Sequence, residues 1–278
     1  MRDYAAFVPV LVKDALLFEE FDPSGNYKFV ARQHPELNYV SINKTAKRIL
    51  DLCAGNSIAT IVSEVINLYP SADKNIVQAD VLNSLRSLWR LGVITWTGSN
   101  LPFDLYLFDS QRQVTYSYLP ENALVRFYQE GNVHYTHFAS VNLDYAVETS
   151  EKFIRASWYS YSRLYYGILA NGEIKAVLCL SYNTFLRAFD VLFLDVVGDF
   201  TLANDMAIRL MDFAFNNCKK NATPIARHLR TYSAFYFYAH GNNEWVKKMA
   251  FTFCGELKKE FSQESTYIYK LEVPSLDI

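Results

Sequence analysis

The sequence predicts an α+β chain made of two domains, and three observations support this prediction. Its 278 residues exceed the length of one typical domain. Short strands and three compact helical segments precede residue 97, whereas long apolar strands dominate after residue 104. A turn-forming stretch, Thr97-Gly98-Ser99-Asn100-Leu101-Pro102, separates the two regions. We therefore expect domains at residues 1–97 and 104–278, the second a mixed α/β domain with a central, mostly antiparallel sheet.

The first domain is expected to begin with strands at residues 8–18 and 27–31 and a third strand near residues 37–42. Three helices follow. Asn43 can cap the first helix by accepting a hydrogen bond from a backbone N–H, and Gly55 supplies the left-handed residue that ends it. Ser57 caps the second helix, and Pro70 prevents its continuation. The third helix spans about residues 75–91 and ends at Gly92.

A closing strand at residues 93–96 completes an order of strand, three helices and strand. This order is typical of a winged helix-turn-helix, a fold that binds either nucleic acid or a peptide. The apolar residues of the third helix are expected to be buried, namely Val77, Val81, Leu85, Leu88 and Trp89. Its exposed face is expected to carry the polar residues Gln78, Asp80, Asn83, Ser84, Arg86 and Arg90.

The run Ser41-Ile42-Asn43-Lys44-Thr45-Ala46, followed by Ile49 to Gly55, resembles the PqqD-like peptide-recognition domain over roughly residues 7–96. The resemblance implies that the leader part of a ribosomally made precursor peptide is the partner. The leader would add as an extra strand beside the third strand and lie against the third helix. The contacts implied are Asn38, Tyr39, Val40, Ser41, Val81 and Leu85. For any one of these residues, a plain core role is the alternative.

Charge favours a peptide over DNA as the partner of the first domain. Residues 1–97 hold ten Lys plus Arg and ten Asp plus Glu, so this domain is formally neutral. Binding to phosphates needs a positive surface. A strand edge at residues 37–42, in contrast, offers main-chain bonds and side-chain pockets to a peptide. A winged-helix regulator with a ligand-sensing domain is therefore the weaker interpretation.

Composition restricts the remaining partners. The formal net charge is −2, and the four cysteines, Cys53, Cys179, Cys218 and Cys254, are far apart and lack metal-ligand spacing. The N-terminus has no signal-peptide pattern, and no apolar run approaches membrane-spanning length. We expect a soluble, cytoplasmic protein with reduced thiols, no metal, and neither a nucleic acid nor a membrane partner.

The second domain is expected to begin its core with a hairpin at residues 163–180, because Asn171-Gly172 lies between two apolar runs. A strand at 189–197, a helix at 202–217, a strand at 234–240, a short helix at 243–249 and a final strand pair at 251–261 and 266–273 follow. Tyr and Phe number twenty each in the chain. An aromatic core and an apolar ligand pocket both explain this richness.

This order of elements, with the ending Asn243-Glu244-Trp245-Val246-Lys247-Lys248-Met249-Ala250-Phe251, resembles the GNAT superfamily of acyltransferases over about residues 120–275. The resemblance implies transfer of an acyl group, acetyl or longer, from acyl-CoA to an amine. It also implies that pantetheine pairs with the backbone at residues 194–197, where the two central strands separate. The cofactor contacts implied are Val196, Val197, Gly198, Thr201, Leu202, Ala203 and Asn243.

The loop that would bind the pyrophosphate departs from the family pattern. Residues 198–205 keep one glycine, lack a basic leading residue and contain Asp199 and Asp205. Carboxylates there disfavour an anion at a helix N-terminus, and Arg209, one turn further on, is expected to offset Asp205 in part. The short helix carries Lys247 and Lys248 where many members have a tyrosine.

Three residues are candidates for catalysis. Asp195, late in the central strand, is a candidate general base, with an ion pair or solvent exposure as the alternative. His240, at the end of the following strand, has an ordinary pKa suited to proton transfer, although loop histidines are common. Tyr238, or its neighbour Tyr236, is a candidate donor of the proton to the leaving thiolate, with half-buried packing as the alternative.

Together the two domains predict an acyl-CoA-dependent N-acyltransferase that modifies a precursor peptide at its N-terminus or at a Lys or ornithine side chain. The first domain would hold the leader and raise the effective concentration of the remaining peptide at the second domain. The alternative is a non-catalytic protein that binds and presents the peptide and retains a degenerate GNAT fold.

Overall fold

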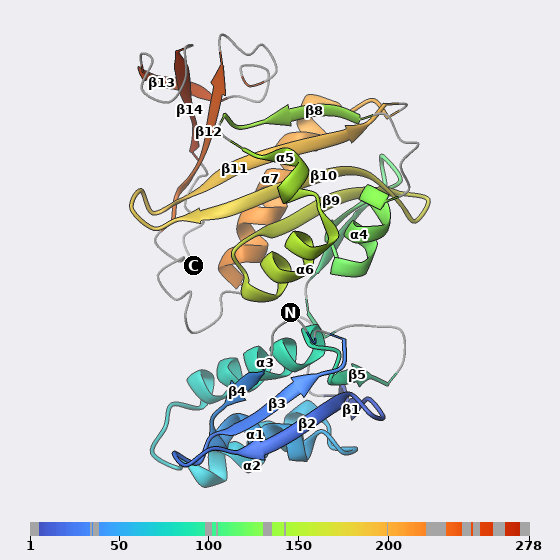
Figure 1. The fold of residues 1–278 in the computed structure, drawn as a ribbon, viewed down its shortest axis with the longest axis vertical. Helices are drawn as coiled ribbons and strands as arrows, with labels where there is room; N and C mark the ends of the chain where they lie inside the picture. Colours follow the sequence, from blue (N-terminus) through green and yellow to red (C-terminus); the bar gives the residue numbers. More distant parts are fainter. Residues whose placement is uncertain are drawn as a thin grey trace. The chain divides into compact units, whose positions relative to one another are not determined.

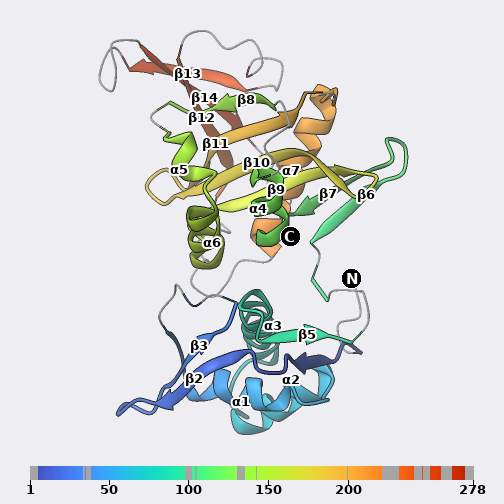
Figure 2. The same ribbon diagram turned by 45° about the vertical axis from the view of Figure 1, so that its right-hand side comes forward.

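The structure is a computed structural model that describes residues 6–33, 35, 39–97, 102–103, 105–129, 135–141, 143–198, 200–220, 232–240, 246, 251–257 and 265–272. The chain divides into two compact units, Met1–Asp104 and Leu105–Ile278. Figures 1 and 2 show the helices and strands of each unit in two views. No helix in these described ranges is both long and apolar enough to cross a membrane.

Within its described residues, unit 1 contains two small antiparallel sheets and three helices. One sheet has the strand order β2 (Leu16–Phe21), β3 (Tyr27–Ala31) and β4 (Val40–Ile42), and the other pairs β1 (Pro9–Leu11) with β5 (Ile94–Trp96). The helices are α1 (Lys44–Leu52), α2 (Ile58–Leu68) and α3 (Lys74–Arg90). The winged helix-turn-helix arrangement stays a prediction.

The ends of these helices follow from local chemistry. The Asn43 side chain accepts a hydrogen bond from the backbone of Ala46 at 2.8 Å, and Ser57 caps α2 in the same way, so both predicted caps are confirmed. Gly55 has the predicted left-handed backbone, with φ of +95°. Helix α3 starts slightly earlier than predicted because the Asp73 side chain caps it, accepting from the Asn75 N–H at 2.7 Å.

The core of unit 1 confirms the predicted apolar face of α3 and corrects its polar face. Val77, Val81, Leu85 and Leu88 are buried, whereas Trp89, also predicted to be buried, is half-buried. Arg86 and Arg90, predicted to be exposed, are only 8% and 5% exposed. The Arg86 guanidinium lies 4.7 Å from the centre of the Phe103 ring, so an aromatic face covers its charge. Burial of two cations leaves still less positive surface for a nucleic acid.

Unit 2 is built on one nine-stranded sheet within the described ranges, with the order β13-β14-β12-β11-β10-β9-β7-β6 and with β8 also paired to β11. All neighbours are antiparallel except β11 and β12, which confirms the predicted, mostly antiparallel sheet. The strands are β6 (Tyr106–Asp109), β7 (Val114–Tyr118), β8 (Tyr135–Ala139), β9 (Leu164–Ala170), β10 (Glu173–Asn183), β11 (Ala188–Val197), β12 (Ala234–His240), β13 (Thr252–Leu257) and β14 (Thr266–Glu272).

In the part of the chain that the structure describes, four helices flank this sheet. Helix α7 (Asn204–Lys220) lies on one face, and α4 (Glu121–Gln129), α5 (Tyr145–Glu148) and α6 (Glu151–Ser160) lie on the other (Figure 1). The predicted Asn171-Gly172 hairpin is confirmed, since both residues have positive φ, 52° and 81°. The predicted helix at 243–249 lies outside the described residues, apart from the buried Val246.

Aromatic side chains fill the core between α7 and the sheet. The Phe189 ring lies 5.1 Å from the ring of Tyr232, 5.7 Å from that of Phe235 and 5.9 Å from that of Phe215, measured between centroids. All four residues are buried. Much of the aromatic content of the chain therefore serves packing, which is the first of the two explanations open from composition.

Candidate functional site

The two central strands of unit 2 separate soon after they pair. Strands β11 and β12 are in register only at Phe189 with Phe235 and at Asp190 with Tyr236. We call the place where they part, beyond Asp190 and Tyr236, the fork. The predicted separation of these strands is therefore present.

The parts of β11 and β12 beyond the fork are its two arms, and strand β8 pairs with the arm formed by β11. It pairs antiparallel with β11 from Phe193, opposite Ala139, to Val197, opposite Tyr135 (Figure 1). The GNAT resemblance assigns this same edge, residues 194–197, to pantetheine. The sequence did not predict β8. As the structure stands, the edge is hydrogen-bonded within the protein and does not fit a pantetheine arm.

Ser140 and Val141 close the base of the fork by bonding to both arms. The Ser140 N–H donates to Leu192 at 2.7 Å, and its hydroxyl donates to the Val191 carbonyl at 2.5 Å. On the other arm, the Val141 N–H donates to the Tyr238 carbonyl at 2.9 Å, and the Tyr238 N–H donates to the Ser140 hydroxyl at 3.4 Å. Ser140 thus provides hydrogen-bond partners for backbone groups of β11 and β12, which are too far apart here to pair with each other.

Asp195 lies on β11 beneath this segment and is 0% exposed. One of its carboxylate oxygens accepts hydrogen bonds from the hydroxyls of Tyr128 and Tyr145, each at 2.7 Å. Burial, and then the Asp195 charge, hold the pKa of Tyr128 well above its usual value, so this hydroxyl keeps its proton. In the backbone register, Asp195 lies opposite His137 of β8. Substrate therefore has no direct access to the Asp195 carboxylate in this conformation.

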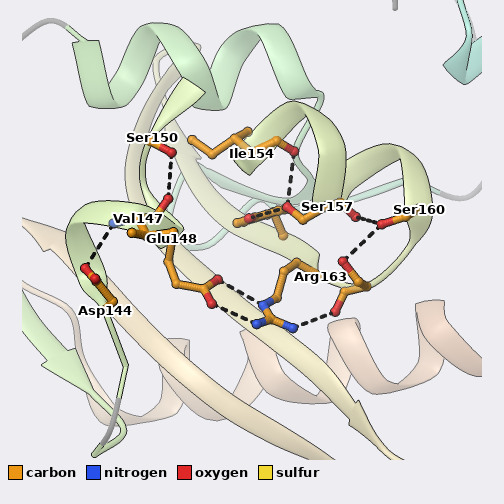
Figure 3. A network of polar contacts seen from close by, with 10 residues as sticks. Asp144, Val147, Glu148, Ser150, Ile154, Ser157, Ser160 and Arg163 are labelled. Atoms are coloured by element: carbon orange, nitrogen blue, oxygen red, sulfur yellow. Dashed lines mark hydrogen bonds and ion pairs between the residues drawn. The ribbon is translucent and has the colours of Figure 1, made fainter. Parts of the chain in front are cut away.

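The helix that carries Tyr145 is anchored by a network of polar contacts (Figure 3). Asp144 caps α5 by accepting from the Val147 N–H at 3.2 Å. Glu148, at the end of α5, accepts two hydrogen bonds from the Arg163 guanidinium, at 2.9 and 2.7 Å. Because Glu148 is buried and doubly bonded, α5 holds Tyr145 firmly over Asp195.

Tyr238 and His240 lie on the other arm of the fork, in β12. The half-buried Tyr238 hydroxyl lies 3.5 Å from an Asp190 oxygen. Burial, together with the Asp190 charge, raises the pKa of Tyr238 to about 12, so Tyr238 is protonated at neutral pH. The backbone of His240 pairs with Thr266 of β14, and its side chain lies outside the described part. The three predicted catalytic residues are therefore on two different arms, with residues 140–141 between the arms.

The predicted cofactor residues lie along the connection from β11 to α7. Val196 is buried and Val197 half-buried at the end of β11, Gly198 and Thr201 are exposed, and Leu202 and Ala203 are half-buried. The Phe200 N–H donates to the Val197 carbonyl at 2.9 Å, which makes a tight turn. The Ala203 carbonyl accepts from Met206 and Ala207 in the first turn of α7. Asp199 and Asn243 lie outside the described residues.

Charged residues near the start of α7 are already paired. Asp205 forms an ion pair with Arg112, from the turn between β6 and β7. Arg209, expected to offset Asp205, instead pairs with Asp109 at 2.5 Å. We call Arg112, Asp205, Arg209 and Asp109 the α7 charge cluster. With two cations and two anions, the cluster has no net positive charge to attract a pyrophosphate.

In unit 1, the predicted peptide-binding edge is available. Strand β4 pairs with β3 on one side, from Val40 opposite Phe29 to Ile42 opposite Tyr27, and no second strand pairs with it in the described ranges. Ser41 is exposed, and Tyr39 is 58% exposed with the Lys28 ammonium 5.0 Å from its ring centre. Val81 and Leu85 have no exposed surface and lie in the core. Asn38 lies outside the described residues.

Sequence reasoning did not find Tyr128, Tyr145 or Ser140. Tyr145 follows Asp144, a residue type typical of helix caps, so the start of α5 had a local signal. No local pattern indicates that Tyr145 reaches Asp195, fifty positions away.

Comparison with known proteins supports the first half of the predicted resemblance. Residues 31–94 match the family model described as coenzyme PQQ synthesis protein D, PqqD. This match confirms the PqqD-like segment predicted from residues 41–55. No curated protein matches the sequence at a significant level.

Several solved structures that resemble this chain are described as acetyltransferases. RimJ of Mycobacterium smegmatis, in complex with CoA-disulfide, is 14% identical with a TM-score of 0.39, over 59% of this chain and 84% of that chain. The ribosomal-protein-S5-alanine acetyltransferase of Vibrio fischeri is 10% identical with a TM-score of 0.42, over 61% and 97%. A GNAT-family acetyltransferase of Desulfovibrio desulfuricans is 12% identical with a TM-score of 0.41, over 58% and 99%.

Proposed function

We propose that the protein is an N-acyltransferase that moves an acyl group from coenzyme A to an amine of a ribosomally synthesised precursor peptide. The observation that carries the proposal is the fork between β11 and β12, in a chain whose residues 31–94 match the PqqD family. The GNAT resemblance implies that the two central strands separate at this place, and this separation is where the acyl donor would bind.

In this proposal, unit 1 binds the leader part of the peptide. The free edge of β4 and the exposed Tyr39 offer main-chain hydrogen bonds and an aromatic contact to an extended leader. Holding the leader raises the effective concentration of the rest of the peptide, which needs no strong binding of its own. The neutral charge of residues 1–97 and the burial of Arg86 and Arg90 favour this partner over a nucleic acid.

Unit 2 supplies groups for proton transfer. Burial and the Asp190 charge raise the pKa of Tyr238 to about 12, so Tyr238 holds a proton at neutral pH. In the proposal it donates this proton to the leaving thiolate of coenzyme A. Asp195 accepts a hydrogen bond from the half-buried Tyr145 hydroxyl, so this hydroxyl would take a proton from the substrate amine and pass its own proton to Asp195. We propose that Asp195, Tyr238 and His240 carry out the proton transfers. The acyl donor would be bound by the predicted cofactor contacts, Val196, Val197, Gly198, Thr201, Leu202, Ala203 and Asn243.

Two measurements test the proposal. Thermal unfolding of the full chain is followed with acetyl-, octanoyl- and palmitoyl-CoA, since a ligand that binds the native state raises the unfolding temperature. Short peptides encoded beside the gene are then incubated with the protein and the thioester that gives a shift. A gain in peptide mass equal to the acyl group supports the proposal, and the absence of acylation with every thioester contradicts it.

The alternative function is a non-catalytic protein that binds a precursor peptide and presents it to another enzyme. Two observations favour it: β8 pairs with the edge that a donor arm would need, and the α7 charge cluster has no net positive charge. In this case the peptides would bind to unit 1 with no thioester-dependent shift and no change in peptide mass.

A further inference from the structure

One segment, residues 135–141, covers the edge of β11 with which a donor arm would pair, a stretch that includes the backbone of Asp195. Its strand part, β8, pairs with β11 at Phe193–Val197. Its last two residues, Ser140 and Val141, bridge the two arms of the fork. Asp195 lies within the covered stretch and is fully buried. Binding of a donor arm at the fork is incompatible with this arrangement, because β8 already pairs with the edge that the arm would need.

The contacts that hold this segment are mostly of a kind that a ligand can replace. β8 pairs with β11 over five residue pairs, whereas β10 pairs with β11 over eight. Within the described ranges β8 has no second strand neighbour, so it is an edge strand. Its ladder consists of main-chain hydrogen bonds, which depend little on sequence and which any linear group with amide N–H and C=O can form.

Ser140 supports the same interpretation. It is buried, yet its hydroxyl bonds only to backbone groups of the two arms, Val191 and Tyr238. A buried polar residue at this place substitutes for a partner that the separating strands lack. A bound amide group would satisfy the same backbone atoms, so removal of Ser140 from the fork need not leave them unpaired.

We propose that residues 135–141 form an exchangeable strand, which occupies the edge of β11 in the free protein and leaves it when the linear, amide-bearing arm of an acyl thioester binds. This inference rests on the proposed acyltransferase function. Exchange opens the edge of β11 to the donor, while the Asp195 carboxylate keeps its hydrogen bonds from Tyr128 and Tyr145. Binding of the donor is therefore coupled to displacement of β8.

Hydrogen exchange followed by mass spectrometry on the full chain tests the exchange directly. Octanoyl-CoA is the probe, with free coenzyme A for comparison. On binding, amides of residues 135–141 should exchange at least about tenfold faster, while those of residues 193–197 stay protected, since the ligand replaces β8 there. Binding of octanoyl-CoA with unchanged exchange at residues 135–141 overturns the inference and leaves the acyltransferase proposal standing.

An engineered disulfide between β8 and β11 provides a matched control, because the same protein can be compared in its oxidised and reduced forms. Thr136 and Val196 are directly opposite in the register, so T136C and V196C together place two thiols across the ladder. Cys254 is the exposed native thiol, and C254S removes it from the background. Oxidation of the pair should abolish thioester binding, and reduction should restore it. Equal binding by the oxidised and reduced forms overturns the inference.

A release variant separates failure of this inference from failure of the proposed function. Ser140→Ala removes both side-chain bonds at the fork, so β8 is held less tightly and thioester affinity should rise about tenfold. If the native chain binds no thioester but S140A does, the strand blocks the site and the inference holds. If neither the native chain nor S140A binds any thioester, the acyltransferase proposal fails, and the inference fails with it.

Discussion

At the scale of single residues, the structure shows how a buried carboxylate is held. Two hydroxyls from separate helices, Tyr128 of α4 and Tyr145 of α5, donate to the same oxygen of Asp195. Asp195 has no exposed surface, so these donors replace the water that an exposed carboxylate would have. Removal of either donor leaves a buried acceptor with less compensation.

Tyr145→Phe and Tyr128→Phe should therefore each lower the free energy of unfolding by about 1–3 kcal/mol, because each removes one hydrogen bond to a buried charged group. The pair should be non-additive, since both hydroxyls serve the same atom. Urea denaturation measures this. Tyr39→Phe, at an exposed position, is the control and should have little effect. Equal stability of all three variants would contradict the role given to the two donors.

Two glycines of unit 1 allow backbone strain to be separated from steric contact. Gly55 and Gly92 both have positive φ, +95° and +67°. A Cβ at Gly92 would lie 2.2 Å from the Gln33 side chain, whereas nothing lies within 4 Å of a Cβ at Gly55. Gly55→Ala should cost about 1 kcal/mol from the backbone alone, and Gly92→Ala should cost about the same, because the flexible end of the exposed Gln33 side chain can move aside. Adding Gln33→Ala should therefore leave the cost of G92A unchanged in chemical denaturation.

At the scale of elements, the fork and the start of α7 determine what unit 2 can bind. β8 covers one arm of the fork, and the α7 charge cluster neutralises the end of the helix. In this cluster Asp205 lies in the first turn of α7 and is exposed, so its carboxylate opposes any anion there.

Asp205→Asn should strengthen binding of acyl thioesters, because it removes a negative charge and leaves Arg112 with one ion-pair partner, Asp109, in place of two. An effect of about 1 kcal/mol, roughly fivefold in Kd, is expected at low salt, and it should shrink as salt screens the charges. Asp212→Asn on the same helix, also exposed, is the matched control for the change in net charge. A similar gain in both variants would show that net charge rather than this site is responsible.

The elements that could be predicted from sequence are those whose cause is local. Caps at Asn43 and Ser57 and the Asn171-Gly172 turn each depend on residues a few positions apart, and each was predicted correctly. β8 has no such local signal, because its partner is β11, more than fifty residues away. The burial of Arg86 was missed for the same reason: its cover includes Phe103, beyond the end of the helix.

At the scale of the whole molecule, the chain consists of two units, each with a core of its own. Unit 1 buries apolar residues from all three helices and both of its sheets, and unit 2 buries the aromatic cluster around Phe189. The units are therefore expected to fold independently.

Residues 1–104, expressed alone, should unfold cooperatively and should bind the same precursor peptides as the full chain. Circular dichroism during urea denaturation, with peptide binding by fluorescence anisotropy, measures both properties. Residues 105–278 alone should show no peptide affinity through the leader. Loss of cooperative unfolding in the shorter chain would contradict the independence of the units.

Buried tyrosines predict how stability responds to alkaline pH. Burial raises the pKa values of Tyr27, Tyr165 and Tyr238 above the ordinary value near 10, to about 12 for Tyr238. The unfolded chain releases these protons first, so the stabilisation is fully present below about pH 10 and is lost as pH rises toward 12. Urea midpoints should therefore fall steeply over this range. Tyr238→Phe, which has no proton to lose, should show a shallower fall than the native chain.

The exchangeable strand also bears on how the protein behaves when it is stored or concentrated. Phe193–Val197 is a run of mostly apolar and β-branched residues, and without β8 it would present an unpaired sheet edge. Such edges recruit strands from other molecules, which leads to aggregation. By keeping this edge covered from within its own chain, the protein carries a safeguard against self-association, and a variant with a weakened β8 should precipitate sooner unless a thioester is supplied.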